Sequence, residues 1–321
     1  MKKVKLSNQE AKGTSDWLPA EFSVRHYIFE TWRRVCSSYG FQEYLTPLVE
    51  SAEIYRAKSG EDVGGKELVT FTDLGGRELC IRPEMTPSVT RLVSKIYASS
   101  PKPLKLFSIA NFMRNEKPQR GRNREFWQLN CDIFGSASLA ADLEILQLSL
   151  DVMQAFGAPE NSFTLRLNSR RLLDNLLPVF GFNVKNKSLI FRILDKYGKL
   201  SRDEFIRRLV EAGAEEESAQ QLSEFMAGGE QELFAKALTE NRELMAAKQE
   251  IDFVLKQLQK LGYNQARFDP TLIRGFDYYD GLVFEVFDNH PDNRRALFGG
   301  GRYNGLAELF GAESFPAVGV A

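Results

Sequence analysis

The spacing of apolar residues changes several times along the chain, and each change predicts a different element. From Pro19 to Tyr39 apolar side chains recur at the spacing of an amphipathic helix, and Gly40 supplies a C-terminal stop. The next segment, Phe41 to Val49, is aromatic and rich in strand-forming residues, but Pro47 cannot donate to a sheet. We therefore expect a long helix packed on a core, followed by a strand that lies at a sheet edge or ends at the proline.

Two hairpins are predicted in the part of the chain that follows. Leu68–Thr72 and Glu78–Ile81 flank an Asp-Leu-Gly-Gly turn, and Thr86 is a suitable N-cap for the next helix. Leu104–Met113 and Phe126–Phe134 are the second and longer pair of predicted strands. The loop that joins this longer pair carries a cluster of cations, namely Arg114, Lys117, Arg120, Arg122 and Arg124.

Alternation divides the returning strand of the longer hairpin into two faces, because side chains two positions apart share a face. One face carries Trp127, Leu129, Cys131 and Ile133, and the other carries Phe126, Gln128, Asn130 and Asp132. The polar face could simply meet water, with the cations in a solvated loop. Alternatively it is the floor of a pocket in which Arg114 and Arg122 hold phosphate oxygens. Phe126 would then stack on a flat ring, and Gln128 and Asp132 would hydrogen-bond a polar ligand.

The second half of the chain contains a long helical stretch between strand patterns. Asp142–Phe156 is predicted as a helix and Phe163–Asn168 as a strand. From Ser169 to Tyr263 amphipathic segments rich in Glu, Lys, Leu and Ala are broken at glycines, which predicts an all-helical insertion. Strand patterns return after this stretch. We therefore expect an α+β fold, with an antiparallel sheet flanked by helices, divided into residues 1–168, 169–263 and 264–321.

The run LFGGGRYNGL at Leu297–Leu306 contains three consecutive glycines but matches no nucleotide-binding pattern. It lacks G-K-[ST], and G-x-G-x-x-G is absent from any strand-to-helix setting. We therefore expect these glycines to allow the close approach of a ligand or of a neighbouring strand.

Composition restricts the classes of function that the chain can serve. With 321 residues, 43% hydrophobic and 26% charged, it is an ordinary globular sequence that is long enough for a large core. Its net charge of -1 means that any RNA contact must come from a local patch such as the cationic loop. Three cysteines without C-x-x-C spacing predict buried free thiols, and two histidines leave almost no material for a zinc site or a catalytic triad. No signal peptide or membrane span is evident, so we expect a cytoplasmic protein without membrane contact.

Four motifs, in this order along the chain, resemble those of the histidyl-tRNA synthetases, a family of class II aminoacyl-tRNA synthetases. They are R-P-E-x-T at Arg82–Thr86, the R-x-E, R-G-R and E-F-W-Q pieces of motif 2 between Arg114 and Gln128, R-G-x-D-Y-Y at Arg274–Tyr279, and G-G-R-Y-x-G-L at Gly300–Leu306. The helix and proline-bearing strand of Pro19–Val49 resemble motif 1, the dimer-forming element of class II enzymes. The resemblance covers the whole chain outside the insertion, and the insertion more loosely. It implies a class II synthetase-type sheet and a homodimer.

The resemblance implies an enzyme, a histidine-tRNA ligase, that activates L-histidine with ATP and Mg2+ to histidyl-adenylate and transfers it to tRNA(His). Negative charge builds on the α-phosphate when the histidine carboxylate attacks it, and preorganised cations stabilise that charge. Arg114 and Arg274 would be these catalytic cations. Glu116 and Arg122 would serve the β- and γ-phosphates with magnesium, and Phe126 would stack on adenine. No metal ligand is assigned to the protein itself.

The resemblance also implies a set of histidine-binding residues, namely Glu84, Thr86, Gln128, Asp132, Arg274, Tyr278 and Tyr279. A neutral imidazole has one donor and one acceptor, and a site that pairs both rejects apolar competitors. Asp132 and Tyr279 would pair the ring, while Gln128, Glu84 and Thr86 would fix the amino group. Asp132 stands where bacterial members commonly have glutamate. Asn304 stands where the family usually has aspartate, a change for which the sequence offers no physical reason.

The last residues, Pro316–Ala321, resemble the opening of motif 3. The glycine-rich helix start and the arginine of that motif are missing, and so is the family's anticodon-binding domain. We therefore expect a truncated catalytic domain with weak activity or none.

Two other functions stay open. One is a catalytically inactive, histidine-sensing regulatory subunit of ATP phosphoribosyltransferase, whose R-P-D-M-T resembles Arg82–Thr86. Against it, Arg274 and the motif 2 arginines are all present, although a sensor does not need them. The other is a non-enzymatic RNA-binding module, which would not require a polar pocket face.

Overall fold

The computed structural model describes residues 7–57, 59–60, 62–119, 121–182, 186–228, 232–273, 278–293 and 295–321. Arg120 of the cationic loop and Arg274 of the expected catalytic pair therefore lie outside the described residues. The chain divides into two compact units. The first comprises Met1–Ser100, Leu106–Asn130 and Ala307–Ala312, and the second comprises Pro101–Lys105, Cys131–Leu306 and Glu313–Ala321.

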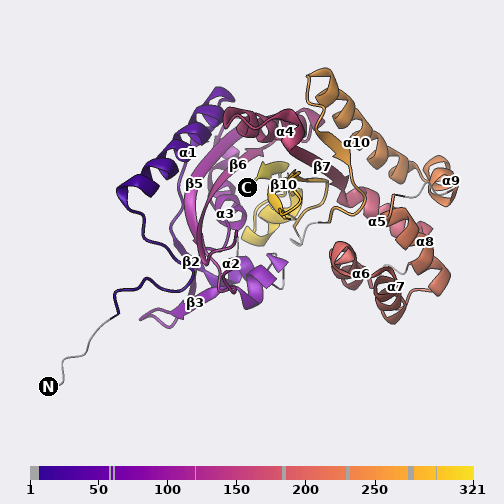
Figure 1. Cartoon of the computed structure of the whole chain (residues 1–321), viewed down its shortest axis with the longest axis horizontal. Coiled ribbons are helices and arrows are strands. Elements are labelled where there is room, and N and C mark those ends of the chain that lie inside the picture. Colours follow the sequence, from indigo (N-terminus) through magenta and orange to yellow (C-terminus); the bar gives the residue numbers. More distant parts are fainter. Residues whose placement is uncertain are drawn as a thin grey trace. The chain divides into compact units, whose positions relative to one another are not determined.

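The first unit contains a long helix, shorter helices and a three-stranded sheet (Figure 1). The α-helices are α1 (Pro19–Ser38), α2 (Ala52–Arg56) and α3 (Thr86–Ile96). The strands are, in sheet order, β2 (Val49–Ser51), β4 (Glu78–Ile81) and β3 (Val69–Thr72). Neighbouring strands are antiparallel, which confirms the predicted hairpin. One small core cluster beside this sheet consists of the buried residues Ala52, Tyr55, Leu68 and Cys80.

Helix α1 has an apolar surface that only its C-terminal half buries. The helix begins with Pro19, where the missing backbone N–H would have no partner inside the helix. Its buried side chains are Thr31, Val35 and Cys36. The Phe29 ring packs against the Trp127 ring, with centroids 5.0 Å apart. Phe22 is 53% exposed, so the N-terminal half of the helix presents apolar side chains to the surface and not to the core.

The second sheet has eight strands in the order β1-β5-β6-β11-β10-β9-β7-β8. The bounds are β1 (Gln42–Glu43), β5 (Leu104–Met113), β6 (Glu125–Phe134), β7 (Phe163–Ser169), β8 (Ala266–Phe268), β9 (Leu282–Asp288), β10 (Ala296–Arg302) and β11 (Ala317–Val320). The pairs β6–β11, β11–β10, β10–β9 and β9–β7 are antiparallel, whereas β1–β5 and β7–β8 at the two edges are parallel. The expected α+β fold with a mainly antiparallel sheet is confirmed, and the edge strands add parallel pairing that the sequence did not predict.

The eight-stranded sheet has strands in both units, and the second unit carries most of the helices. They are α4 (Leu139–Ala155), α5 (Arg170–Val179), α6 (Lys187–Leu194), α7 (Arg202–Glu211), α8 (Glu216–Met226), α9 (Glu232–Glu240) and α10 (Arg242–Lys260). Helix α4 packs on β11, and α5 and α10 pack on β7. From α5 to α10 the described regular elements are all helical (Figure 1). Among the helices that the structure describes, none is both long and apolar enough to cross a bilayer.

Candidate functional site

Arg114 stands at the base of the cationic loop, where β5 ends. Its backbone N–H donates to the carbonyl oxygen of Arg124 at 2.8 Å, which closes the loop. Its Nε donates to the carbonyl oxygen of Pro83 at 3.0 Å, and its guanidinium carbon lies 5.0 Å from the centroid of the Phe126 ring. Arg114 is thus held beside both the R-P-E-x-T loop and the aromatic side chain that was expected to stack on adenine.

Glu116 and Arg122 face each other across the same loop. Arg122 Nη1 donates to Glu116 Oε2 at 2.8 Å, and Arg122 and Gln119 also exchange backbone hydrogen bonds at 2.8 and 3.0 Å. The Glu116 side chain is largely buried, while that of Arg122 is 46% exposed. The Arg122 guanidinium is therefore accessible to an anionic ligand, which would share it with Glu116.

Phe126 lies at the start of β6 with its ring partly buried. The Phe112 ring stacks on it with centroids 5.9 Å apart and planes 29° apart. Together with the Arg114 guanidinium, this gives one aromatic and one cationic neighbour to the same ring. Phe126 is therefore an aromatic ring with a cation beside it, which suits a ligand that carries both a flat ring and a phosphate group.

The R-P-E-x-T loop is fixed by its arginine. Arg82 is buried and donates from Nη1 to the Thr46 carbonyl oxygen at 2.8 Å and from Nε to the Asn111 carbonyl oxygen at 3.0 Å. Burial lowers the pKa of Arg82 from its ordinary value. A third carbonyl oxygen, that of Pro47, lies 3.5 Å from Arg82 Nη1, so Arg82 fixes the backbone around this loop.

Glu84 and Thr86 are both buried, with Glu84 only 4% exposed. The expected N-cap is displaced by one position, because α3 begins at Thr86 itself and Met85 occupies the cap position. No side chain makes a capping hydrogen bond at this helix start. Thr86 is therefore not the N-cap of this helix that the sequence predicted it to be.

Gln128 and Asn130 continue the polar face of β6 within the first unit. Gln128 is partly buried and Asn130 is buried. Gln128 Oε1 and Asn130 Oδ1 are buried acceptors without a hydrogen-bond partner in the described structure. Buried acceptors are normally paired, so these two oxygens mark a place where a donor of a ligand or of water would be stabilised.

Asp132, also on β6, belongs to the second unit and is 3% exposed. Its Oδ1 accepts a hydrogen bond from the Tyr303 hydroxyl, and its Oδ2 is buried without a partner. Burial raises the pKa of Asp132 to about 7, against the smaller opposing effect of the Tyr303 hydrogen bond. A carboxyl group of this kind can accept from one further donor, which suits the N–H of a neutral imidazole.

Gly319 makes room for this carboxylate. It lies opposite Asp132 in the antiparallel pair of β11 and β6, and a Cβ atom at position 319 would come 2.0 Å from Asp132 Oδ1. Any other residue would have to displace the carboxylate. The glycine is therefore required by the acidic side chain across the ladder.

Tyrosines surround the same part of the second unit. Tyr278 is buried, and its ring meets the Tyr303 ring edge-on at 5.8 Å and the Tyr279 ring at 4.7 Å. The Tyr279 ring lies over Gly301, where a Cβ atom would come 2.8 Å from it. The expectation that the triple glycine allows close approach is confirmed, since Gly301 admits this ring and Gly300 admits the backbone of Gly319.

The predicted site residues thus form two groups, one in each unit. In the first unit Arg114 and Phe126 are neighbours, Glu116 pairs with Arg122, and Glu84, Thr86 and Gln128 are buried or partly buried. In the second unit Asp132 is linked through Tyr303 to Tyr278. No group of three or more potential metal-binding carboxylate, thiol or imidazole side chains occurs among the described residues. Sequence reasoning missed Tyr303 and Gly319, because neither carries a local signal for contact with a residue 171 or more positions away.

Residues 13–321 match the family profile described as Histidyl-tRNA synthetase. The chain is 41% identical to the histidine-tRNA ligase of Leptospira biflexa, over 99% of this chain and 73% of that protein. It is 37% identical to the histidine-tRNA ligase of Pyrococcus abyssi, over 98% of this chain and 73% of that protein.

Solved structures share the fold. One, described as an ATP phosphoribosyltransferase regulatory subunit/histidyl-tRNA synthetase from Bacillus halodurans C, has a TM-score of 0.81 at 23% identity, over 99% of this chain and 81% of that one. The histidyl-tRNA synthetase of Nostoc sp. PCC 7120 has a TM-score of 0.81 at 21% identity, over 98% and 73%. The profile match and the 41% identity confirm the resemblance found in the motifs, and the chain belongs to the histidyl-tRNA synthetase family.

Proposed function

We propose that this chain activates L-histidine with ATP, in the presence of Mg2+, to histidyl-adenylate and pyrophosphate, and transfers the histidyl group to tRNA(His). The observation that carries the proposal is Asp132, a buried carboxyl group with one oxygen bonded to Tyr303 and the other unpaired. A buried acceptor that lacks a donor is stabilised by a ligand that brings one. Neutral histidine brings that donor in its imidazole ring.

On the histidine side of the reaction, we propose the contacts that the motif resemblance implies. Asp132 would accept from the imidazole N–H, and Tyr279 would face the other ring nitrogen. Gln128 Oε1, a buried acceptor without a partner, would receive a hydrogen bond from the amino group. Glu84 and Thr86 would complete the contacts to that amino group, where a buried carboxylate offsets the positive charge.

The ATP side would use the cationic loop. Attack of the histidine carboxylate on the α-phosphate concentrates negative charge there, and Arg114, already fixed by the Pro83 carbonyl group, is preorganised to stabilise it. Arg274, outside the described residues, is proposed as its catalytic partner. Phe126 would hold adenine, and Arg122 the terminal phosphates. Magnesium commonly binds through phosphate oxygens and one or two carboxylates, and Glu116 is the carboxylate of this loop that fits that role.

We further propose a homodimer, formed through the region Pro19–Val49. Exposed large apolar side chains gather on α1 and the segments beside it, namely Trp17, Leu18, Phe22, Val24, Tyr27, Leu45, Leu48 and Val49. Exposed apolar side chains that recur in one region of a chain are consistent with an interface there. The division into a catalytic core at 1–168 and 264–321 with a helical insertion at 169–263, and a cytoplasmic location, are part of the same proposal.

The second candidate function is a histidine-sensing regulatory subunit without catalysis. The fold likeness to the Bacillus halodurans protein favours it, since that structure carries both descriptions. The accessible cation of Arg122 and the fixed cation of Arg114 favour the enzyme, because a sensor of histidine alone has no phosphate to bind.

Histidine-dependent exchange of pyrophosphate into ATP tests the proposal. The wild-type protein would be compared with Arg114→Gln and with Arg202→Gln, a matched control at an exposed arginine of α7. We expect exchange that requires histidine, falls by a factor of roughly 100 or more in Arg114→Gln, and is unchanged in the control. Histidine binding without any exchange would support the regulatory function and refute the enzymatic one.

A further inference from the structure

Asp280 follows Tyr279 directly and is one of the residues that attach this segment to the rest of the second unit. Its backbone N–H donates to the Arg302 carbonyl oxygen at 3.0 Å. Its carboxylate accepts from the Asn304 backbone N–H at 2.9 Å and from Asn304 Nδ2 at 3.1 Å. The Gly305 backbone N–H also donates to this carboxylate. Hydrogen bonds thus hold Asp280 through both its backbone and its side chain, and Asn304 supplies two of those that reach the side chain.

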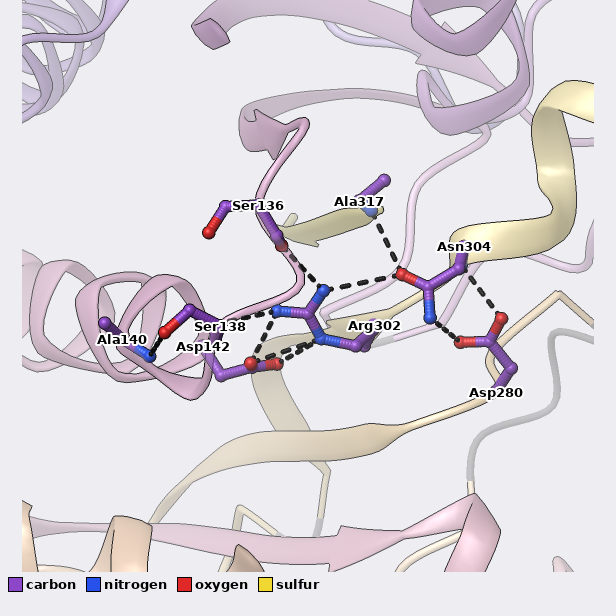
Figure 2. A network of polar contacts seen from close by, with 8 residues as sticks. All are labelled: Ser136, Ser138, Ala140, Asp142, Asp280, Arg302, Asn304 and Ala317. Atoms are coloured by element: carbon purple, nitrogen blue, oxygen red, sulfur yellow. Dashed lines mark hydrogen bonds and ion pairs between the residues drawn. The ribbon is translucent and has the colours of Figure 1, made fainter. Parts of the chain in front are cut away.

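The amide of Asn304 is oriented by charges of opposite sign on its two ends. Its oxygen accepts from the Ala317 backbone N–H at 3.2 Å and from Arg302 Nη1 at 3.4 Å, while its nitrogen donates to Asp280 (Figure 2). Reversing the amide would turn its NH2 group toward a cation and an N–H donor, and its oxygen toward a carboxylate. Only one orientation satisfies these neighbours.

Arg302, which orients the Asn304 amide, is itself held in place by several hydrogen bonds. The residue is 8% exposed, and its Nε and Nη2 donate to the Asp142 carboxylate at 2.9 and 2.5 Å. Its Nη1 and Nη2 also donate to the carbonyl oxygens of Ser136 and Ser138 at 3.0 and 3.3 Å. Figure 2 shows the guanidinium between the start of α4 and Asn304. A planar group held on several sides has little freedom to follow a displaced neighbour.

We propose that Asn304 is a positioning residue, which holds the Tyr278–Tyr279 part of the histidine site in place through Asp280. That this segment binds histidine rests on the proposed function. The residue must be an amide because it stands between the Arg302 cation and the Asp280 carboxylate. An aspartate at 304 would satisfy Arg302 and Ala317 but would face Asp280 with a second carboxylate. These contacts give a physical reason for the asparagine at position 304 of this chain.

We predict that exchanging the two side chains, with aspartate at 304 and asparagine at 280, preserves the contacts between these positions. In the double variant Asn304→Asp/Asp280→Asn, the amide of residue 280 would accept from the backbone N–H of residue 304 and donate to its carboxylate. The same carboxylate would accept from Arg302 and Ala317. The hydrogen bonds that join residues 280, 302, 304 and 317 are therefore kept, whereas Asn304→Asp alone opposes two carboxylates. Asp280→Asn alone removes the charge and also leaves one acceptor oxygen for the two donors of Asn304.

Two measurements test the proposal on these variants. Hydrogen–deuterium exchange of peptides covering 278–282 reports how firmly the segment is held. The KM values for histidine and for ATP in pyrophosphate exchange report whether the histidine site follows. For Asn304→Asp we expect faster deuterium exchange and a KM for histidine raised by roughly 10- to 100-fold, with the KM for ATP unchanged. The KM defect should shrink toward pH 5, where one of the two facing carboxylates is protonated, and the double variant should restore both readouts.

Each part of the proposal can fail separately. Unchanged deuterium exchange in Asn304→Asp would overturn the positioning role, whether or not the protein is an enzyme. Faster deuterium exchange with an unchanged KM for histidine, in an active protein, would show that Asn304 holds the segment but does not affect histidine binding. A double variant as impaired as Asn304→Asp would overturn the charge argument. A wild-type protein without histidine-dependent activity would refute the proposed function, while the deuterium comparison would still decide whether Asn304 holds the segment.

Discussion

Replacing Asp132 by asparagine should change how the stability of the protein depends on pH. The pKa of Asp132 is raised to about 7 by burial, from the ordinary value of 3.8 that the unfolded chain would show. Below both values the carboxyl group is protonated in the folded and unfolded states, and its ionisation contributes nothing. As pH rises between them, the unfolded state loses the proton while the folded state keeps it. The folded state is therefore progressively destabilised up to a pH of about 7, and the full penalty remains above it.

The magnitude follows from the two pKa values. A separation of about 3 units corresponds to about 4 kcal/mol of unfolding free energy when the penalty is complete. Between about pH 5 and about pH 8, ionisation of this one group should lower the unfolding free energy of the wild type by about 2.5 kcal/mol. Asp132→Asn lacks this contribution. Its new NH2 group, at the place of the unpaired oxygen, costs about 1–3 kcal/mol at either pH and cancels in the comparison.

Urea unfolding at the two pH values, followed by tryptophan fluorescence and without histidine, measures the effect. The quantity of interest is the difference in unfolding free energy between variant and wild type, which should shift by about 2.5 kcal/mol in favour of the variant from pH 5 to pH 8. Asp203→Asn, at an exposed carboxylate of α7, is the control and should show no such shift. A difference that is the same at both pH values would refute the reasoning, because it would mean that Asp132 ionises in the folded protein as it does in the unfolded chain.

Three further predictions concern other parts of the structure. Gly319→Ala should displace the Asp132 carboxylate, lower the unfolding free energy by about 1–3 kcal/mol and weaken histidine binding in calorimetry; unaltered affinity would contradict the close approach. Phe126→Leu should raise the KM for ATP by roughly 10-fold in pyrophosphate exchange and leave the KM for histidine unchanged, because only the stacking surface is lost. Phe22→Glu should produce a monomer in size-exclusion chromatography with light scattering, since a charge would enter the proposed apolar interface; a dimer as stable as the wild type would place the interface elsewhere.

Elements with a local pattern were predictable from the sequence. The spacing of apolar residues predicted helix α1, the two hairpins and the helical stretch. These elements were predictable because the period of apolar residues depends only on the local geometry of a helix or a strand. In place of one strand over Phe41–Val49, the structure has two short strands, Gln42–Glu43 and Val49–Ser51. Pro47 lies between them and cannot donate a backbone hydrogen bond. Pro47 indicated in advance that the strand would be interrupted. Which residues then paired depended on the strands that lie next to them in the fold.

Contacts across long separations were not predictable. The Arg302–Asp142 ion pair joins residues 160 positions apart, and the sequence around each gives no indication of the other. The same holds for Tyr303 and Asp132. Motif resemblance supplied the names of several site residues, but the reason for Asn304 became apparent only when its neighbours on other strands were known.

The order of the strands has a consequence for how the protein is made. Strand β11 comes after β10 in the sequence, yet it lies between β10 and β6 and pairs with both. During synthesis β6 and β10 emerge first, and neither can make its native ladder on the side of β11 until residues 317–320 have left the ribosome. The two strands that carry Asp132 and the chain leading to Tyr303 must therefore wait with open edges for their shared partner. A chaperone that covers such edges, or a pause in translation, would act on this protein at that stage.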